Sequence, residues 1–367
     1  MLKAGIIGLP NVGKSTLFNA LIKSHKAPAE NYPFCTIEPN LGVVAVPEPR
    51  LEQIARVAGV GKLIPATVEF VDIAGLVKGA AQGEGLGNKF LSHIREVDAL
   101  VHVVRCFEDP DIIHVTGSPD PVRDIEIVAT ELALADLEAV RRRREKITKE
   151  IKQAEKHAVA ESHILDRLEA HLNTGQPAAT LHLAKEEWTI ARNCFLLSSR
   201  PTLFVANVKE SDLATVDTHP LVTAVRNYAR THQGGATVVV GAQLESDLID
   251  LTPEEAAAYL RELGVAEPGG AALIRHTYLL LGLRTFFTFN DKEVRAWTIH
   301  GGDTAARAAG TIHTDFERGF IKAETVSCAE LVKAGSITHA RETGHYRIEG
   351  RDYEVKDGDV LLFRFST

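Results

Sequence analysis

Residues 8–16 read Gly8-Leu9-Pro10-Asn11-Val12-Gly13-Lys14-Ser15-Thr16 and match the pattern G-x-x-x-x-G-K-[ST] at every fixed position. The apolar residues 4–7 before this stretch predict a buried strand, and residues 17–22 after it have helical spacing. Between a strand and a helix, the pattern forms a loop whose backbone N–H groups and helix N-terminus surround phosphate groups. The predicted nucleotide-binding residues of this loop are Asn11, Val12, Gly13, Lys14, Ser15 and Thr16. Lys14 is expected to reach the β- and γ-phosphates, and the Ser15 hydroxyl to ligate Mg²⁺.

Two downstream segments supply further candidate ligands. Thr36 lies in a polar segment interrupted by prolines, where it is either a second hydroxyl ligand of Mg²⁺ in a first switch loop or simply a turn residue. Asp72 ends an apolar strand and starts the sequence Asp72-Ile73-Ala74-Gly75. In this position the carboxylate is expected to hold Mg²⁺ through water, and the Gly75 N–H to contact the γ-phosphate.

The residue that orients the attacking water is not obvious. Ras-like hydrolases carry a glutamine directly after the glycine of this motif, and Leu76 occupies that place here. Another group must therefore position the water, or hydrolysis is slow. His114 lies in a loop of a type that could cover the phosphates, and its ordinary pKa is near neutral. From position alone, an exposed loop histidine is an equally good interpretation.

The sequence Asn207-Val208-Lys209-Glu210 follows a later apolar strand. GTP-specific proteins carry Asn-Lys-x-Asp there, and the aspartate accepts two hydrogen bonds from guanine. Glu210 is one methylene longer, and Val208 replaces the lysine, so guanine recognition is expected to weaken by ~1–3 kcal/mol. ATP is therefore expected to be preferred, with a tolerated variant that still prefers GTP as the alternative. Ala242 is predicted to present its backbone to the base.

The order of the patterns predicts an α/β protein with three parts. Residues 1–125 and 200–282 form a P-loop nucleotide-binding domain, residues 126–199 an inserted antiparallel helical hairpin, and residues 283–366 a small α+β domain. The hairpin is expected to consist of one long helix within residues 125–158 and a second at 178–197. Its arginine run (Arg141–Arg144) is either a solvated helix face or a contact for RNA phosphates.

The composition is ordinary for a globular protein. Hydrophobic residues make up 45% and charged residues 25% of 367 residues, and the net charge is −8, so nucleic-acid binding would need a local basic patch. No run of about 18 apolar residues predicts a membrane span, and the first strand leaves no room for a signal peptide. The four cysteines have no metal-like spacing, which favours a reducing compartment and a cytoplasmic location.

Taken together, these motifs resemble the YchF subfamily of Obg-like P-loop ATPases and GTPases, of the TRAFAC class, over nearly the whole chain. Two more stretches, Arg295-Ala296-Trp297-Thr298-Ile299 and Phe320-Ile321-Lys322-Ala323-Glu324, resemble the TGS domain of that family, a β-grasp fold. The resemblance implies preference for ATP, contact with ribosomes, and a hydrophobic residue at the position of Leu76. It also implies a water-positioning role for His114. The start of the base-binding segment, Gly241-Ala242-Gln243, departs from the family's usual Ser/Cys-Ala.

The expected function is that of a Mg²⁺-dependent switch that binds and hydrolyses ATP and associates with ribosomes or their subunits. Lys14, Gly75 and His114 are the expected catalytic residues, and K⁺ is a candidate activating ion besides Mg²⁺. A cytoplasmic monomer is expected. Two alternatives stay open at this point: a nucleotide-gated ribosome- or RNA-binding module with negligible turnover, and a conventional GTP-specific GTPase.

Overall fold

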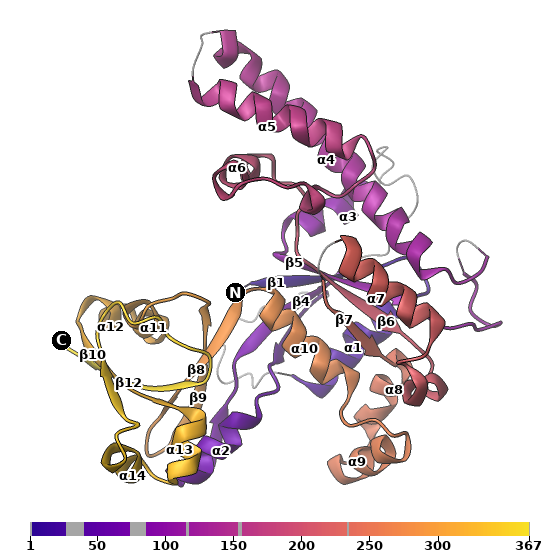
Figure 1. Cartoon of the computed structure of the whole chain (residues 1–367). Coiled ribbons are helices and arrows are strands. Elements are labelled where there is room, and N and C mark those ends of the chain that lie inside the picture. Colours follow the sequence, from indigo (N-terminus) through magenta and orange to yellow (C-terminus); the bar gives the residue numbers. More distant parts are fainter. Residues whose placement is uncertain are drawn as a thin grey trace. The chain divides into compact units, whose positions relative to one another are not determined.

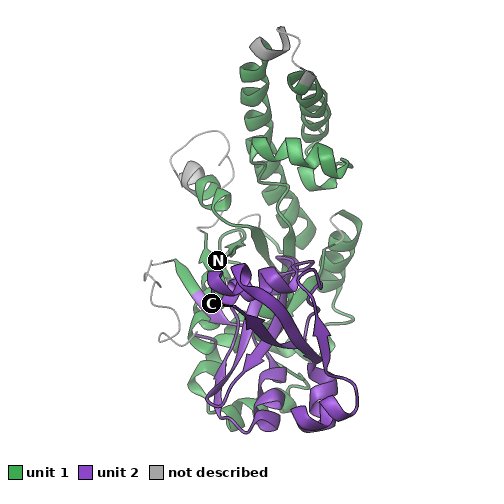
Figure 2. Cartoon of the chain, turned by 90° about the vertical axis from the view of Figure 1, so that its left-hand side faces the viewer, with its two compact units in different colours: residues 1–24, 38–42, 69–277 green, residues 25–37, 43–68, 278–367 purple. Residues whose placement is uncertain are grey.

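The computed structural model describes residues 2–26, 40–73, 86–114, 117–152, 156–232 and 235–366. The chain forms two compact units, each built from segments that are far apart in the sequence (Figures 1 and 2). The first unit comprises residues 1–24, 38–42 and 69–277, and the second comprises residues 25–37, 43–68 and 278–367. The predicted division placed residues 1–125 in one domain, whereas residues 43–68 belong to the second unit.

The sheet that carries the phosphate loop has six strands in the order β2-β4-β1-β5-β6-β7. The strands are β1 (Lys3–Ile7), β2 (Leu41–Ala45), β4 (Thr67–Asp72), β5 (Ala99–Arg105), β6 (Thr202–Asn207) and β7 (Thr237–Val240). β1 pairs in parallel with β4 and β5, and β6 pairs in parallel with β5 and β7. β5 and β6 are buried along their whole length, as is typical of central parallel strands. The predicted α/β P-loop fold is confirmed.

Helices connect and surround these strands (Figure 1). They are α1 (Lys14–Ser24), α3 (Leu86–Arg95), α4 (Pro121–Lys152), α5 (Lys156–Leu172), α6 (Lys185–Ala191), α7 (Pro220–His232), α8 (Ala242–Asp247), α9 (Pro253–Glu262) and α10 (Gly269–Leu280). Among the described residues, four short 3-10 helices also occur: η3 (Ala178–Thr180), η4 (Arg192–Cys194), η5 (Glu210–Thr215) and η6 (Leu248–Asp250). Because parallel strands end at the same edge of a sheet, the loops after β1, β5 and β6 meet there.

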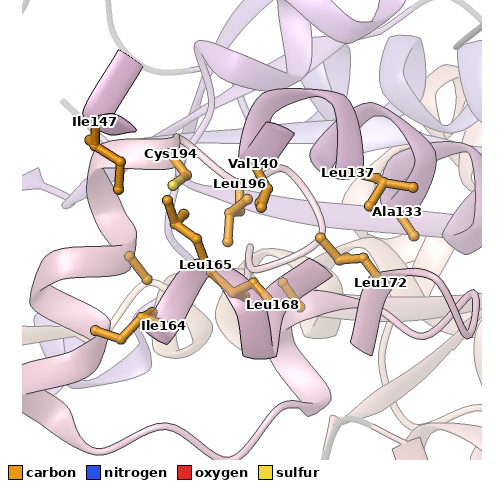
Figure 3. Packing of buried hydrophobic residues seen from close by; sticks show 12 residues of the cluster. Ala133, Leu137, Val140, Ile147, Ile164, Leu165, Leu168, Leu172, Cys194 and Leu196 are labelled. Atoms are coloured by element: carbon orange, nitrogen blue, oxygen red, sulfur yellow. The ribbon is translucent and has the colours of Figure 1, made fainter. Parts of the chain in front are cut away.

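The inserted hairpin consists of α4 and α5, not of the helices that the sequence pattern predicted. The expected second helix at 178–197 is wrong, since that region holds only η3, α6 and η4. Figure 3 shows the reason: leucines of α5 pack against the apolar face of α4. The buried cluster comprises Ala133, Leu137, Val140, Ile147, Ile164, Leu165, Leu168, Leu172, Ala178, Ala191, Cys194 and Leu196.

The arginine run lies on the hairpin and is fully engaged in ion pairs. Arg141 Nε lies 2.9 Å from Glu169, Arg142 lies 3.0 Å from Glu138, and Arg144 pairs with Asp166 and Glu169. The Nε atom of Arg143 lies 2.6 Å from the buried carboxylate of Glu161. Pairs that join residue 141 to 169 and 144 to 166 require that α4 and α5 run antiparallel. Arg141 and Arg142 are 54% and 75% exposed, as on a solvated helix face, whereas Arg143 reaches a buried partner. Contact of the run with RNA stays a prediction.

The second unit contains a six-stranded sheet in the order β11-β10-β12-β8-β9-β3. Its strands are β3 (Lys62–Ile64), β8 (Leu283–Phe289), β9 (Glu293–His300), β10 (Phe320–Ser327), β11 (Arg347–Glu349) and β12 (Asp359–Phe365). Its helices are α2 (Pro49–Ala58), α11 (Ala305–Ile312), α12 (Thr314–Arg318), α13 (Cys328–Ala334) and α14 (Ile337–Glu342). The predicted β8–β9 hairpin is confirmed, and β8 lies beside β12 in parallel.

Part of the early segment 43–68 joins this second sheet through β3, although residues 43–45 belong to β2 of the first sheet. β3 pairs in parallel with β9, Lys62 opposite Glu293 and Ile64 opposite Arg295. Arg50 of α2 donates to Asp357 at 2.8 Å, and its guanidinium lies 5.2 Å from the centre of the Phe287 ring. Because of these contacts the second unit includes residues 43–68, whereas the predicted C-terminal domain contained only residues 283–366. Within the described part of the chain, no helix has the length and apolarity that a membrane span requires.

Candidate nucleotide-binding site

The phosphate loop connects the end of β1 to the start of α1 and has the backbone that its glycines predict. Gly8 has φ +156° and Gly13 has φ +89°, a region that L side chains rarely adopt. A Cβ at Gly8 would lie 2.6 Å from the Val103 carbonyl oxygen, and one at Gly13 would collide with the Asn207 amide. Asn11 also has a positive φ, 61°. The tight backbone conformation of the loop therefore requires glycine at positions 8 and 13.

A cavity of about 520 Å³ lies over this loop. Its walls are formed by Leu9, Pro10, Asn11, Gly13, Lys14, Ser15, Thr16, Asn40 and Asp72. All of these residues belong to the first unit, and most of them are the residues that the motifs predicted. Asn40 was not predicted, because a single asparagine outside any motif carries no signal.

The charged and hydroxyl groups of the cavity are in direct contact with one another. The Lys14 ammonium pairs with the Asp72 carboxylate, and the Ser15 hydroxyl donates to the other Asp72 oxygen at 3.0 Å. Lys14 is only 8% exposed, so this charge is largely removed from water. A hydroxyl and a carboxylate oxygen thus lie side by side, and Mg²⁺ prefers such oxygen ligands. The residues present fit a magnesium site that also uses phosphate oxygens.

Asn207 connects the phosphate loop to the region predicted to bind the base. Its Nδ2 donates to the Val12 carbonyl at 2.8 Å, and its Oδ1 accepts from the Ala242 N–H at 2.9 Å. Asn207 is 3% exposed, and both partners are equally buried. Val208 is buried too, and its N–H donates to the Val240 carbonyl. The ends of β6 and β7 and the phosphate loop are therefore held as one assembly.

Glu210 begins η5 at the end of the base loop, which we define as residues 207–210. Its Oε1 accepts a hydrogen bond of 2.6 Å from the Tyr259 hydroxyl, which belongs to α9. This hydrogen bond raises the pKa of the Tyr259 phenol. The sequence did not indicate Tyr259, since its contact with residue 210 spans a gap of 49 residues without a motif.

The loop that carries His114, residues 106–114, is fastened at several points. The buried guanidinium of Arg105 donates to the carbonyls of Phe107, Asp109 and Ile112 at 3.0–3.3 Å. Asn11 of the phosphate loop donates to the Ile113 carbonyl at 3.2 Å. Lys209 of the base loop lies 3.4 Å from Asp109. The loop therefore contacts both the phosphate loop and the base loop.

His114 itself is buried, which overturns the interpretation of an exposed loop histidine. Its Nε2 lies 2.9 Å from the Oδ2 atom of Asp124, in the first turn of α4, and both side chains are at most 3% exposed. Burial raises the pKa of the Asp124 carboxyl, and the imidazole opposes this rise. A role for His114 in positioning water stays a prediction. The predicted residues Thr36 and Gly75, and Leu76, lie outside the described residues.

Comparisons with known proteins identify relatives of this chain. Residues 3–159 match the family described as "50S ribosome-binding GTPase", and residues 283–366 match the YchF-GTPase_C family, described as a protein of unknown function (DUF933). The Ribosome-binding ATPase YchF of Bacillus subtilis is 48% identical over 100% of this chain and 99% of its own length. The protein of the same name from Escherichia coli O157:H7 is 49% identical over 99% of each chain.

A solved structure extends the similarity to the whole fold. The Schizosaccharomyces pombe YchF GTPase matches with a TM-score of 0.86 at 34% identity, over 99% of this chain and 97% of that one. The chain therefore belongs to the YchF family of P-loop nucleoside triphosphatases.

Proposed function

We propose that this chain is a Mg²⁺-dependent ATPase that prefers ATP to GTP and acts in the cytoplasm as a nucleotide-controlled switch on ribosomes. The observation that carries the proposal is the contact of Lys14, Ser15 and Asp72 inside the cavity over the phosphate loop. Relatives named ribosome-binding ATPases support ATP as the nucleotide and the ribosome as the partner.

The geometry suggests how the chain's own groups respond to a triphosphate. Phosphate oxygens compete for the Lys14 ammonium, which then leaves Asp72 and neutralises the β- and γ-phosphates. Asp72 becomes available together with Ser15 to hold Mg²⁺, with Thr36 as the second hydroxyl. When bound, Mg²⁺ neutralises charge that develops on the phosphate oxygens. The Gly75 N–H is proposed to contact the γ-phosphate.

The other end of the nucleotide is assigned to the base loop. Asn207 keeps the loop and the Ala242 backbone fixed relative to the phosphate loop, because its amide bonds to both. Val208 stands where GTP-binding proteins carry a lysine, and its side chain packs in the core, so only the backbone of this residue is proposed to border the base. Glu210 supplies the carboxylate that faces the base.

His114 is the proposed water-positioning group. To act, the buried ring must become accessible to water, but its contact with Asp124 need not break, because a carboxylate can hold one ring nitrogen while the other acts. This engagement also favours the second candidate function, a nucleotide-gated binding module with negligible turnover. The two candidates differ in whether His114 matters for phosphate release.

Competition of ATP and GTP for the site is the first test. ATP is expected to bind more tightly than GTP to the wild-type chain, and Lys14→Ala to lose most of its ATP affinity. Unchanged ATP affinity in Lys14→Ala would contradict the proposal, and tighter GTP binding would favour a conventional GTPase.

Ribosome co-sedimentation separates the two candidate functions. Binding is measured with ATP, ADP and a non-hydrolysable ATP analogue, for the wild type and for His114→Ala. A switch that depends on hydrolysis predicts that His114→Ala behaves with ATP as the wild type does with the analogue. A binding module predicts identical sedimentation of both proteins and phosphate release that His114→Ala leaves unchanged.

A further inference from the structure

The hydroxyl of Tyr259 is directed at the carboxylate that is proposed to recognise the base. Its oxygen lies 2.6 Å from Glu210 Oε1, and both side chains are half-buried. Both residues belong to the first unit and lie in well-defined elements, α9 and η5. The contact therefore joins two regular elements of the unit that contains the nucleotide-binding site.

Helix α9 is anchored in a way that keeps Tyr259 in place. Thr252 accepts a hydrogen bond from the Glu255 N–H, and the Glu255 carboxylate accepts from the Thr252 N–H at 2.9 Å. This reciprocal arrangement is a capping box, and Pro253 at the first helical position adds a fixed φ. Tyr259 follows within two turns on the same short helix. The capped first turn of α9 thus helps to hold Tyr259 in position.

The Tyr259 phenol acts as a hydrogen-bond donor at neutral pH. Its hydrogen bond to Glu210 raises its pKa above an ordinary value that is already well above neutrality. The Glu210 oxygen must therefore be the acceptor. Hydrogen bonds to an ionised carboxylate are among the stronger ones in proteins. Tyr259 thereby fixes the direction of one of the two carboxylate oxygens.

The two purine bases make different demands on such a carboxylate. Guanine presents a ring N–H and an exocyclic amino group side by side, so a carboxylate binds it best with both oxygens turned to that edge. Adenine presents one amino group beside a ring acceptor, so a single oxygen suffices. A carboxylate whose Oε1 is directed at α9 offers one well-placed oxygen to a base.

We propose that Tyr259 is a specificity-determining residue, which holds Glu210 in a position that disfavours guanine relative to adenine. The inference rests on the proposed use of the base loop and deepens it. It assigns the preference for ATP to a pair of residues, Glu210 and Tyr259, and not to the length of the glutamate alone.

The test measures the dissociation constants of ATP, GTP and ITP by titration calorimetry on the full chain. Tyr259→Phe removes only the hydroxyl and keeps the ring. The ratio of GTP to ATP affinity is expected to rise about tenfold, the value of one hydrogen bond to a charged group. ITP keeps the ring N–H of guanine and lacks the exocyclic amino group, so its gain should be smaller. ATP affinity should stay the same.

Tyr346→Phe is the matched control, because the Tyr346 hydroxyl donates to the Glu324 carboxylate at 3.0 Å in the second unit. It should leave all three constants unchanged. Equal weakening of ATP and GTP by Tyr259→Phe, or no change in their ratio, would reduce Tyr259 to a structural tether and overturn the inference. The wild-type constants alone test the preference for ATP, so failure of that preference is distinguishable from failure of the role of Tyr259.

Discussion

Replacement of Asn207 by alanine should loosen the assembly that joins the phosphate loop to the base loop. The change removes the donor to the Val12 carbonyl and the acceptor for the Ala242 N–H. Both backbone groups are buried, since Val12 and Ala242 are at most 2% exposed. Each buried polar group left without a partner costs about 1–3 kcal/mol. Because water can hydrogen-bond to part of the exposed groups, we expect the free energy of local opening at this site to fall by about 3 kcal/mol.

Hydrogen–deuterium exchange measures this loss at the site itself. A fall of about 3 kcal/mol corresponds to roughly 100-fold faster exchange at the Ala242 amide, where exchange is limited by the opening equilibrium. Urea unfolding followed by circular dichroism gives the global value in parallel. Asn207→Asp refines the test, because it keeps the acceptor for Ala242 and places a second acceptor against the Val12 carbonyl.

Asn227→Ala is the matched control, since Asn227 is exposed on α7 and should change stability by no more than about 0.5 kcal/mol. If Asn207→Ala lost less than about 1 kcal/mol and left exchange at Ala242 unchanged, the assignment of Asn207 as the link between the two loops would be refuted.

Buried charges and proton-binding groups supply three further tests. Burial lowers the pKa of His102 from 6.5 to about 4, so the folded protein binds fewer protons than the unfolded chain between these values. The neutral His102 therefore lowers the free energy of unfolding by nothing above pH 6.5 and by about 3 kcal/mol as the pH drops towards 4. His102→Leu should flatten this part of a series of urea-unfolding curves measured at different pH values. Asp124→Ala should cost about 2 kcal/mol of stability and lower kcat because the imidazole loses the carboxylate that orients it, with no further fall in kcat in a His114→Ala background; phosphate-release assays measure this, and an equal fall in that background would contradict it. Arg143→Ala leaves a buried carboxylate unpaired and should cost about 3 kcal/mol. Arg142→Ala removes an exposed pair with Glu138 and should change the free energy of unfolding by no more than about 0.5 kcal/mol. Equal losses of thermal stability in the two variants would disprove the difference.

The parts of the fold that could be predicted from the sequence are those specified by neighbouring residues. The phosphate loop needs glycines at two fixed positions and a lysine at the helix start, and all three are adjacent in the sequence. The β8–β9 hairpin follows from alternating apolar residues around the turn at residues 290–292. Asn207 and Asp72 could be assigned because each ends a strand whose parallel partners end at the same sheet edge.

The parts that could not be predicted depend on contacts between distant segments. Residues 153–155 contain neither Gly nor Pro, so nothing in the pattern marked the end of α4. β3 has three residues and is recognisable only through its pairing with β9. The burial of His114 requires Asp124, and the orientation of Glu210 requires Tyr259. In each case a tertiary partner decided the outcome, and local propensity did not.

The pairing of β3 with β9 has a practical consequence for dissecting this protein. A truncation after residue 282 would remove the strand beside β3 and Asp357, one of the two acidic partners of Arg50. Residues 43–68 would then remain without the sheet to which they contribute. Likewise, a fragment of residues 283–366 expressed alone would lack its edge strand and helix α2. Chimaeras that exchange the C-terminal region with a relative should therefore carry over the early segment as well.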